Sequence, residues 1–472
     1  MAILGTAGHI LIFPYPAQGH MIPLLDLTNQ LASRGLTITI LVTPKNLPLL
    51  NPLLSLNPSI KTLVLPFPAH PSIPNGVENA KDLPARSVVA MMRALGELYN
   101  PLLTWFKNHP SPPVAIISDM FLGWTQKLAS EIGIRRIVFS PSGAMALYIM
   151  FALWKDMPKM NNADDLTEVL TFSKLPNSPK YPWWQLSPLY RSYVEGDPDS
   201  EFIKGVFRGN IASWGLIINS FSGLERVYLD HLAKQLEGDK VWAVGPLLPP
   251  RDDSRAAERG GSSSVSADDV LSWLDTFQNQ SVVYVCFGSQ AVLNNDQMEE
   301  LALGLEKSPV RFLWAIKEPT KGHVEGKYGA IPPGFEDRVA GRGLVIRGWV
   351  PQVSILSHRA VGAFLTHCGW NSVLEAIVAG VPMLAWPMGA DQFVNAGLLV
   401  DELKVATRAC EGAQTVPNPT ELAKKLAESV SDNRVLKERA MKLRQAALDG
   451  IKEGGSSFKD LDSSVKHIAV EL

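Results

Sequence analysis

The segment from Val361 to Trp386 reads as a strand, a tight turn, a helix and a second strand, and it restricts the possible folds more than any other part of the chain. Val361–Thr366 is apolar enough for a buried strand, Ser372–Ala379 has helical spacing closed by Gly380, and the residues from 381 to 386 are apolar again. A strand–helix–strand unit of this length predicts a parallel sheet covered by helices. We therefore expect an α/β fold.

The turn inside this segment has the composition of an anion-binding site. It reads Thr366-His-Cys-Gly-Trp-Asn-Ser372, and Gly369 permits a sharp turn and a close approach of the backbone. The helix that follows presents unpaired N–H groups and about half a positive charge at its start. We predict that a phosphate group binds here.

Residues on either side of the turn extend this prediction to a nucleotide sugar. Trp349 offers a flat surface for a base, and Gln352 can donate to and accept from a ribose. Glu375 lies on the helix and could accept from ribose hydroxyls. Asp391 and Gln392 follow the next strand, at the end where such sheets bind ligands, and could bind sugar hydroxyls. Each residue alone fits an ordinary strand–helix–strand crossover, but the set together favours a nucleotide-sugar site.

This set resembles the nucleotide-sugar signature of the plant family-1 UDP-glycosyltransferases. Trp-x-Pro-Gln, His-Cys-Gly-Trp-Asn-Ser, Glu and a final Asp-Gln match it position for position. Phe287-Gly288-Ser289 and the N-terminal Pro-Ala-Gln-Gly-His motif also occur in the family's order, so the resemblance extends over essentially the whole chain. It implies a GT-B fold, in which two Rossmann-like doubly wound domains face each other across a cleft.

The resemblance also implies a role for each residue of the signature. Trp349 would stack on uracil, and the ribose would be held by Gln352 and Glu375. The diphosphate would contact His367, Asn371 and Ser372, and the sugar would contact Trp370, Asp391 and Gln392. The further donor-binding candidates are Val350, Gly369, Ser289 and Ser142.

The residue at position 392 bears on which sugar is transferred. In the family a final Gln usually accompanies UDP-glucose, whereas His at that place often accompanies other sugars. Gln392 therefore favours glucose and argues mildly against galactose. UDP-rhamnose and UDP-xylose stay open as alternative donors.

Two residues of the N-terminal half carry the expected chemistry. His20 follows the apolar strand His9–Phe13 at the start of a helix, and an imidazole with a pKa of about 6.5 suits a base at neutral pH. Asp119 ends the candidate strand at 114–119, where its carboxylate could bond to an imidazole or cap the helix that begins near Phe121. From position alone, His20 also fits a surface or capping histidine. Resemblance to the family's Gln-Gly-His motif and His–Asp dyad implies that His20 is the general base and Asp119 its partner.

The acceptor pocket is expected mainly in the N-terminal half. An apolar cleft with few polar groups suits a flat aromatic guest, although aromatic residues more often belong to a core. Hydroxyl and carboxylate acceptors both stay open. The acceptor-binding candidates are Gly19, Phe121, Met145, Trp154, Trp183, Trp184 and Phe393.

The composition changes after Pro246 and divides the chain in two. We predict an N-terminal domain over residues 1–246, a flexible linker rich in Pro, Gly and Ser over 247–268, and a C-terminal domain over 269–454. By the resemblance, the last helix, at about 455–472, crosses back onto the N-terminal domain.

Bulk composition argues against several classes of protein. The 472 residues suffice for two domains of about 200 residues each. A net charge of −2 gives no reason to expect nucleic acid or an anionic membrane as partner. No apolar run reaches the ~18–20 residues of a spanning helix, and the N-terminal run, which stops at Pro14, has no basic stretch before it. Cys286, Cys368 and Cys410 fit neither a disulfide framework nor a zinc pattern. We expect a cytoplasmic monomer.

Two Asp-x-Asp patterns resemble the metal site of the other major glycosyltransferase fold. Asp197-Pro-Asp199 is expected in a loop and Asp460-Leu-Asp462 in a terminal helix, and neither ends a strand. We predict no metal and no cofactor apart from the UDP-glucose co-substrate. The helix start at Asn371 and Ser372, with His367 and the Ser289 turn, could stabilise the leaving UDP through oriented dipoles.

The expected reaction is the inverting transfer of glucose from UDP-glucose to a hydroxyl of a small aromatic plant metabolite, such as a flavonoid, a stilbene or a simple phenolic. A catalytically silent UDP-sugar-binding module would lack the base or its partner, whereas His20 and Asp119 are both present. A Rossmann oxidoreductase would have Gly-x-Gly-x-x-Gly after a strand, and no such arrangement follows His9–Phe13 or the candidate strand at 281–287.

Overall fold

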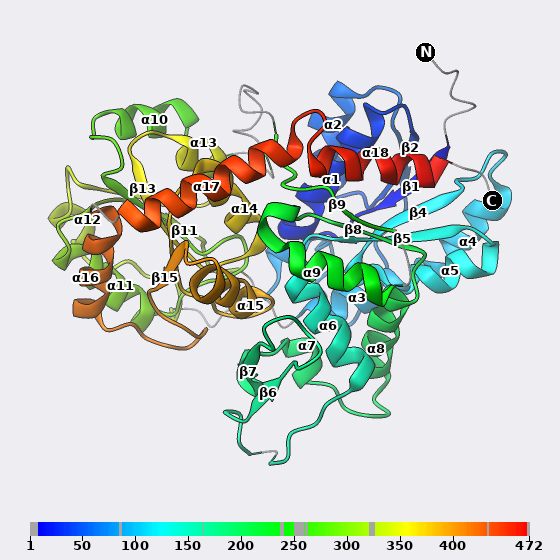
Figure 1. Ribbon diagram of the computed structural model, residues 1–472, viewed down its shortest axis with the longest axis horizontal. Coiled ribbons are helices and arrows are strands. Elements are labelled where there is room, and N and C mark those ends of the chain that lie inside the picture. The colour runs from blue at the N-terminus through cyan, green and yellow to red at the C-terminus, as the bar shows by residue number, and fades with distance from the viewer. Residues whose placement is uncertain are drawn as a thin grey trace. The chain divides into compact units, whose positions relative to one another are not determined.

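The chain forms two compact units (Figure 1). The computed structural model describes residues 8–84, 87–162, 164–236, 240–249, 259, 263–320, 326–431 and 434–469. The N-terminal unit comprises residues 1–80, 86–248 and 449–472, and the C-terminal unit comprises residues 81–85 and 249–448. Positions 250–258 and 260–262 of the expected linker lie outside the described residues.

The N-terminal unit is built on a parallel sheet, which has seven strands within the described residues. The strand order is β3-β2-β1-β4-β5-β8-β9, and every neighbouring pair is parallel. Successive strands are added on one side of β1 up to β3 and on its other side from β4 onward, so the topological switch point of this doubly wound sheet lies between β1 and β4. The strands are β1 His9–Phe13, β2 Thr37–Val42, β3 Lys61–Val64, β4 Ala115–Asp119, β5 Arg135–Ser140, β8 Gly215–Ile218 and β9 Val241–Ala243.

Helices cover this sheet and supply its core. Apolar side chains of β1, β2 and α1 pack together with Leu461 and Ile468 of the last helix, α18, which lies along β9 (Figure 1). A small antiparallel pair, β6 Val169–Thr171 and β7 Lys180–Pro182, stands apart from the main sheet. The helices are α1 Gln18–Ala32, α2 Asn51–Leu56, α3 Val88–Gly96, α4 Tyr99–Asn108, α5 Thr125–Ile132, α6 Ala144–Asp156, α7 Pro188–Arg191, α8 Pro198–Ile211, α9 Ser222–Gln235 and α18 Ser456–Ala469, with the 3-10 turns η1 Leu47–Leu50, η4 Met120–Leu122 and η5 Trp183–Gln185.

The C-terminal unit repeats this plan with a sheet of six parallel strands in its described part. The order β12-β11-β10-β13-β14-β15 places its switch point between β10 and β13. The strands are β10 Val282–Cys286, β11 Arg311–Ile316, β12 Gly343–Arg347, β13 Val361–Thr366, β14 Met383–Ala385 and β15 Ala406–Arg408. The helices are α10 Ala267–Asp275, α11 Asn295–Lys307, α12 Phe335–Arg338, α13 Gln352–Ser357, α14 Trp370–Ala379, α15 Gln392–Gly397, the π-helix Leu398–Glu402, α16 Pro419–Val430 and α17 Arg434–Ile451, within which the chain leaves this unit at Asp449.

The predicted α/β class with two Rossmann-like units is confirmed, because both sheets are parallel and doubly wound. The expected strands agree with the observed ones to within one or two residues at each end. Helix α1 begins at Gln18 rather than near His20, since the Ala17 carbonyl already accepts from the backbone N–H groups of His20 and Met21.

The two Asp-x-Asp patterns have structural partners. Asp197 was expected in a loop, but it is the N-cap of α8, and its carboxylate accepts from the Ser200 backbone N–H at 2.9 Å. In α18, Asp460 accepts from the Ala243 backbone N–H at 3.0 Å and Asp462 pairs with Arg34. In the part of the chain that the structure describes, no cluster of three or more His, Cys, Asp or Glu residues could hold a metal ion.

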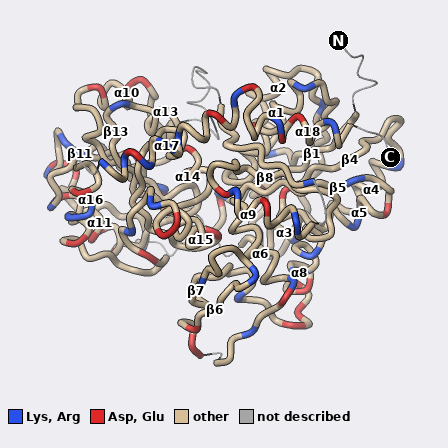
Figure 2. The backbone as a smooth tube through the Cα atoms, viewed as in Figure 1, with Lys and Arg blue, Asp and Glu red and all other residues tan. Residues whose placement is uncertain are grey.

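Charged residues are mixed along both units. Figure 2 shows Lys and Arg interspersed with Asp and Glu rather than gathered in blocks of one sign. None of the helices described here has the length and apolar character needed to span a membrane.

Candidate active site

The switch point of the N-terminal unit brings His20 and Asp119 together. Strands β1 and β4 are adjacent and parallel, with Phe13 opposite Ser118, so the segments that follow them leave the same edge of the sheet. His20 lies in the first turn of α1, which follows β1, and Asp119 is the last residue of β4. Residues 99 positions apart in sequence therefore become neighbours.

The two side chains form a hydrogen-bonded pair. His20 Nδ1 lies 2.9 Å from Asp119 Oδ2, and the Asp119 side chain is fully buried while that of His20 is 18 % exposed. An ionised carboxylate can only accept, so Nδ1 carries the proton and the lone pair of Nε2 is left to act as a base. Asp119 Oδ1 also accepts from the Phe121 backbone N–H at 2.8 Å, so the aspartate caps the next turn as well.

Aromatic rings enclose the imidazole on two sides. The His20 ring centroid lies 4.5 Å from that of Phe121 and 5.3 Å from that of Tyr15, and Tyr15 packs edge-on against Phe121. Tyr15 is buried, and its pKa is raised by burial and, to a smaller extent, by the negative charge of Asp119. The base candidate therefore has a fixed orientation and limited access to water.

Phe121 is the acceptor-binding candidate whose ring contacts His20. Gly19 is exposed beside it. Trp154 is fully buried and stacks on Phe207, with ring centroids 5.3 Å apart, as a core residue would. Met145 is buried in α6, Trp183 and Trp184 are in η5, and Phe393 is buried in α15 of the C-terminal unit.

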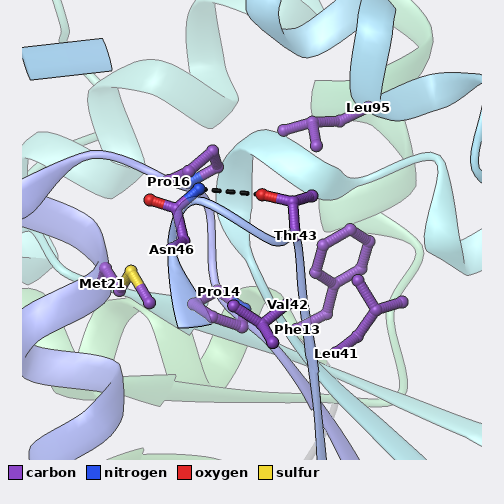
Figure 3. Close-up of a pocket in the computed structure, with 9 residues that line it drawn as sticks. All are labelled: Phe13, Pro14, Pro16, Met21, Leu41, Val42, Thr43, Asn46 and Leu95. Carbon is purple, nitrogen blue, oxygen red and sulfur yellow. Dashed lines mark hydrogen bonds between the residues drawn. The ribbon is translucent and has the colours of Figure 1, made fainter. Parts of the chain in front are cut away.

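A small apolar recess lies at the carboxyl ends of β1 and β2 (Figure 3). It has room for about one water molecule, and none of the acceptor-binding candidates lines it. Asn46 Nδ2 donates to Thr43 Oγ1 at 2.9 Å on its wall. The lining residues are Phe13, Pro14, Pro16, Met21, Leu41, Val42, Thr43, Asn46 and Leu95.

The C-terminal unit gathers the donor signature at its own switch point. Strands β10 and β13 are adjacent and parallel, with Cys286 opposite Thr366. The segment with Gly288 and Ser289 follows β10, and the segment with His367 follows β13, so both leave the same edge of the sheet. Ligands of doubly wound folds bind at this place.

The imidazole of His367 is packed between two glycines. A Cβ atom on Gly288 would lie 2.6 Å from its Cε1 and Nε2 atoms, and one on Gly369 would lie 2.4 Å from Nε2. Loss of solvation lowers the pKa of His367 to about 4, so the ring is neutral at pH 7. Its buried Nδ1 has no hydrogen-bond partner among the described residues.

The sequence predicted that Gly369 makes the sharp turn before α14, but the residue with the left-handed conformation is Cys368. Cys368 has the positive φ, +63°, whereas Gly369 is the N-cap with φ −61°. Gly369 is required for the close approach to His367 instead. The strained turn is held by Asn395, whose Nδ2 donates to the Cys368 carbonyl at 2.9 Å.

The residues expected to hold the ribose lie in contact with one another. Gln352 Nε2 donates to Ser372 Oγ at 3.0 Å and to Glu375 Oε2 at 2.6 Å. The buried Tyr284 hydroxyl donates to Gln352 Oε1 at 3.0 Å, and Arg259 forms an ion pair with Glu375. The side chains of Gln352, Ser372 and Glu375 therefore form one hydrogen-bonded network between α13 and α14.

The remaining signature residues lie at the ends of neighbouring elements. Trp349 is half-buried just before α13, and Val350 beside it is buried. Asp391 and Gln392 begin α15, and Gln392 Oε1 accepts from the backbone N–H groups of Met388 and Gly389, at 2.9 and 3.0 Å. These two bonds fix the orientation of the Gln392 amide, whose nitrogen is the hydrogen-bond donor of this side chain.

The structure gives the other signature residues the following positions. Trp370, Asn371 and Ser372 form the first turn of α14, and Ser289 is half-buried in the turn after β10. Ser142 belongs to the N-terminal unit, where it is buried after β5 and its carbonyl accepts from Ser140 Oγ at 3.0 Å.

Several contacting residues escaped the sequence analysis. Tyr284 lies in an apolar strand run, and Asn395 and Arg259 belong to no motif, so no local signal marks them. Arg136 could have been noticed, because a charged residue within an otherwise apolar strand is unusual.

Comparisons with known proteins agree with this arrangement. The family model "UDP-glucoronosyl and UDP-glucosyl transferase" matches residues 260–451. UDP-glycosyltransferase 89B2 of Stevia rebaudiana is 61 % identical over 99 % of both chains, and flavonol 3-O-glucosyltransferase UGT89B1 of Arabidopsis thaliana is 59 % identical over 98 % of this chain and 96 % of its own.

A solved structure extends the similarity to the whole fold. UGT89C1 of Arabidopsis thaliana, crystallised with UDP-L-rhamnose, superimposes with a TM-score of 0.83 at 40 % identity over 99 % of this chain and 100 % of its own. The same protein has been crystallised with quercetin.

Fold and site together define a glycosyltransferase of the GT-B class that uses a UDP-sugar. The chain belongs to the plant family-1 UDP-glycosyltransferases. The identification expected from the signature is confirmed.

Replacing Gly288 by Ala is expected to weaken UDP binding at least about tenfold, which corresponds to about 1.4 kcal/mol. The added methyl group would clash with His367, and the residue's φ of +77° disfavours any side chain. Isothermal titration calorimetry with UDP measures the effect. Gly341→Ala is the matched control, because Gly341 in the same unit has φ +80° but no atom within 4 Å of the added Cβ. Equal UDP affinities in the two variants would contradict the packing role of Gly288.

Proposed function

We propose that this protein transfers glucose from UDP-glucose to a hydroxyl group of a flavonol-type acceptor, with inversion at the anomeric carbon. The observation that carries the proposal is the buried contact between His20 and Asp119 at the switch point of the N-terminal unit. The acceptor class is supported by the name of the 59 %-identical flavonol 3-O-glucosyltransferase and by the quercetin complex of UGT89C1.

The proton of the acceptor hydroxyl passes to His20 Nε2. Asp119 holds the proton of Nδ1 in place and stabilises the imidazolium that forms. The acceptor oxygen forms a bond to the anomeric carbon, and the bond from that carbon to the UDP oxygen breaks with its electron pair leaving on UDP. The products are the glucoside and UDP, and the imidazolium returns its proton to solvent. A phenol, with a pKa of about 10, gives up its proton more easily than an alcohol.

The charge that develops on the UDP oxygens is met by the C-terminal unit. The N-terminus of α14 presents backbone N–H groups at Asn371 and Ser372, and the neutral His367 ring can donate from one nitrogen. Trp349 stacks on uracil, and the pair of Gln352 and Glu375 binds the ribose. These groups make a metal ion unnecessary, so activity should persist in EDTA.

Glutamine at position 392 supports glucose as the donor sugar. Its Oε1 is occupied by two backbone N–H groups, so the side chain offers its amide N–H to a sugar hydroxyl. UDP-rhamnose is the second candidate, because UGT89C1, at 40 % identity, was crystallised with UDP-L-rhamnose.

A donor competition tests the proposal. The purified protein is incubated with quercetin and equimolar UDP-glucose, UDP-rhamnose, UDP-xylose and UDP-galactose, and the products are separated by mass spectrometry. We expect the hexoside as the main product, and single-donor reactions then distinguish glucose from galactose. A dominant rhamnoside or pentoside would overturn the glucose assignment. Absence of any product from a phenolic panel, with UDP bound normally, would overturn the proposed transfer itself.

A further inference from the structure

Arg136 is a buried cation below the turn that carries Asp119. Its side chain begins on β5 opposite Ile116 and is 1 % exposed. Its Nη2 lies 3.5 Å from the carbonyl oxygen of Asp119. A buried charge is costly unless it is compensated, so its retention in the core calls for an explanation.

The hydrogen bonds of this guanidinium all go to neutral acceptors among the described residues. Nε donates to Ser118 Oγ at 3.0 Å and to Thr125 Oγ1 at 2.9 Å. Nη2 donates to Asn210 Oδ1 at 2.9 Å, and Nη1 reaches the Gly209 carbonyl at 3.4 Å. Burial lowers the pKa of Arg136 to about 9, and the negative charge of Asp119 acts in the opposite direction. Asp119 is therefore its electrostatic counterpart.

Helix α8 closes this network tightly against the turn. A Cβ atom on Gly123 would lie 1.9 Å from the Val206 carbonyl oxygen, and one on Gly209 would lie 2.4 Å from the Gly123 carbonyl oxygen. Asn210 accepts from Arg136 through Oδ1 and donates through Nδ2 to the Met120 carbonyl at 2.7 Å. The residues on both sides of Asp119 are thus tied to Arg136, directly or through Asn210.

We propose that Arg136 is a positioning residue for the pair of His20 and Asp119. It fixes the turn that carries Asp119 through its bonds to Ser118 and Asn210, and its positive charge is buried beside that turn. This inference rests on the proposed function of His20 as the base.

Few other charges face the pair. Tyr15 from the β1–α1 segment is neutral at pH 7, because its pKa is raised. The charged residues of the helices that pack near the turn have partners elsewhere. Lys127 lies over Tyr99, Glu131 accepts from Tyr99, Arg93 pairs with Asp199, Lys204 pairs with Glu201 and Arg208 reaches the Trp154 carbonyl.

The test compares Arg136→Gln, which removes the charge, with Arg136→Lys, which keeps it. The readout is the pH dependence of kcat/KM, measured with one donor and one acceptor throughout so that substrate ionisation is common to all variants. A nearby cation disfavours the formation of an imidazolium, so removal of the Arg136 charge should move the acid limb of the profile to higher pH. We expect a shift of about one pH unit for Arg136→Gln and a limb within about 0.3 unit of the original for Arg136→Lys. UDP affinity should be unchanged in both.

An unchanged acid limb in a folded Arg136→Gln variant would overturn the inference, and so would equal shifts in both variants, which would indicate packing rather than charge. If Arg136→Gln does not fold, Asn210→Asp decides, because it places a carboxylate beside the retained guanidinium and should move the limb in the same direction. A limb that stays in place in that variant refutes the electrostatic role. Failure of the proposed function is distinguishable, because it would show as full activity in His20→Ala.

Discussion

Replacing His20 by Ala is expected to lower kcat/KM for glucosyl transfer by about 10²–10⁴-fold, the range that general-base catalysis supplies. The variant loses the Nε2 lone pair that receives the acceptor proton in the proposed reaction. His20 is partly exposed in the first turn of α1, so the fold should tolerate the change. Initial rates with UDP-glucose and quercetin measure the loss.

UDP binding is the control for this variant. The donor signature belongs to the C-terminal unit, so the dissociation constant of UDP should stay within about twofold of the original value. A His20→Ala protein that transfers glucose at nearly the original rate would remove the assignment of the base. A variant that also loses UDP binding would indicate a general structural defect.

Asp119→Asn is expected to cost nearly as much, about 10²–10³-fold in kcat/KM. To keep the cap on the Phe121 backbone N–H, the new amide must place its oxygen at the Oδ1 position and its nitrogen toward His20. The amide N–H₂ then donates to Nδ1, which forces the imidazole proton onto Nε2 and removes the base. Steady-state kinetics measure the loss, and circular dichroism should show an unchanged fold.

Asp460→Asn is the matched control for this substitution. Asp460 is also a carboxylate that accepts from a backbone N–H in the N-terminal unit, but it lies in α18 and contacts Ala243. Its asparagine variant should retain full activity. Similar activities for the Asp119 and Asp460 variants would contradict the role assigned to Asp119.

The donor signature was predictable because its residues are close together in sequence. The turn from Thr366 to Ser372 and the helix after it contain most of the signature residues, and local patterning placed the start of the helix within two residues. Strand β10 and the glycine-containing turn after it, where Ser289 lies, were predicted from an apolar run that ends at Phe287-Gly288. The contact of Gln352 with Glu375 was implied by their shared assignment to the ribose.

The pairing of His20 with Asp119 came from resemblance, and the strand order supplies its physical reason. In both units the first and fourth strands of the sheet are neighbours, so their following segments meet at one edge. Arg136, Asn395 and Tyr284 could not be assigned in this way. Their roles depend on side chains that cross between elements far apart in sequence, and such contacts leave no periodic signal.

The backbone conformation of the turn before α14 was also not predicted correctly from the sequence. Gly369 was the expected residue for a left-handed backbone conformation, but Cys368 has the positive φ. Gly369 lacks a Cβ atom, and this allows His367 to pack closely against it. The acceptor-binding candidates show a similar limit. Aromatic side chains pack equally well into a core, and Trp154 does so, whereas Phe121 lies against His20.

The anomeric configuration of the product tests the central claim most directly. In the proposed reaction, an acceptor oxygen that His20 has deprotonated attacks directly and displaces UDP from the opposite face of the sugar. UDP-α-glucose and quercetin should therefore give the β-glucoside, which the coupling constant of the anomeric proton in the NMR spectrum identifies. An α-glucoside would contradict the account, because retention requires a second displacement or a different mechanism.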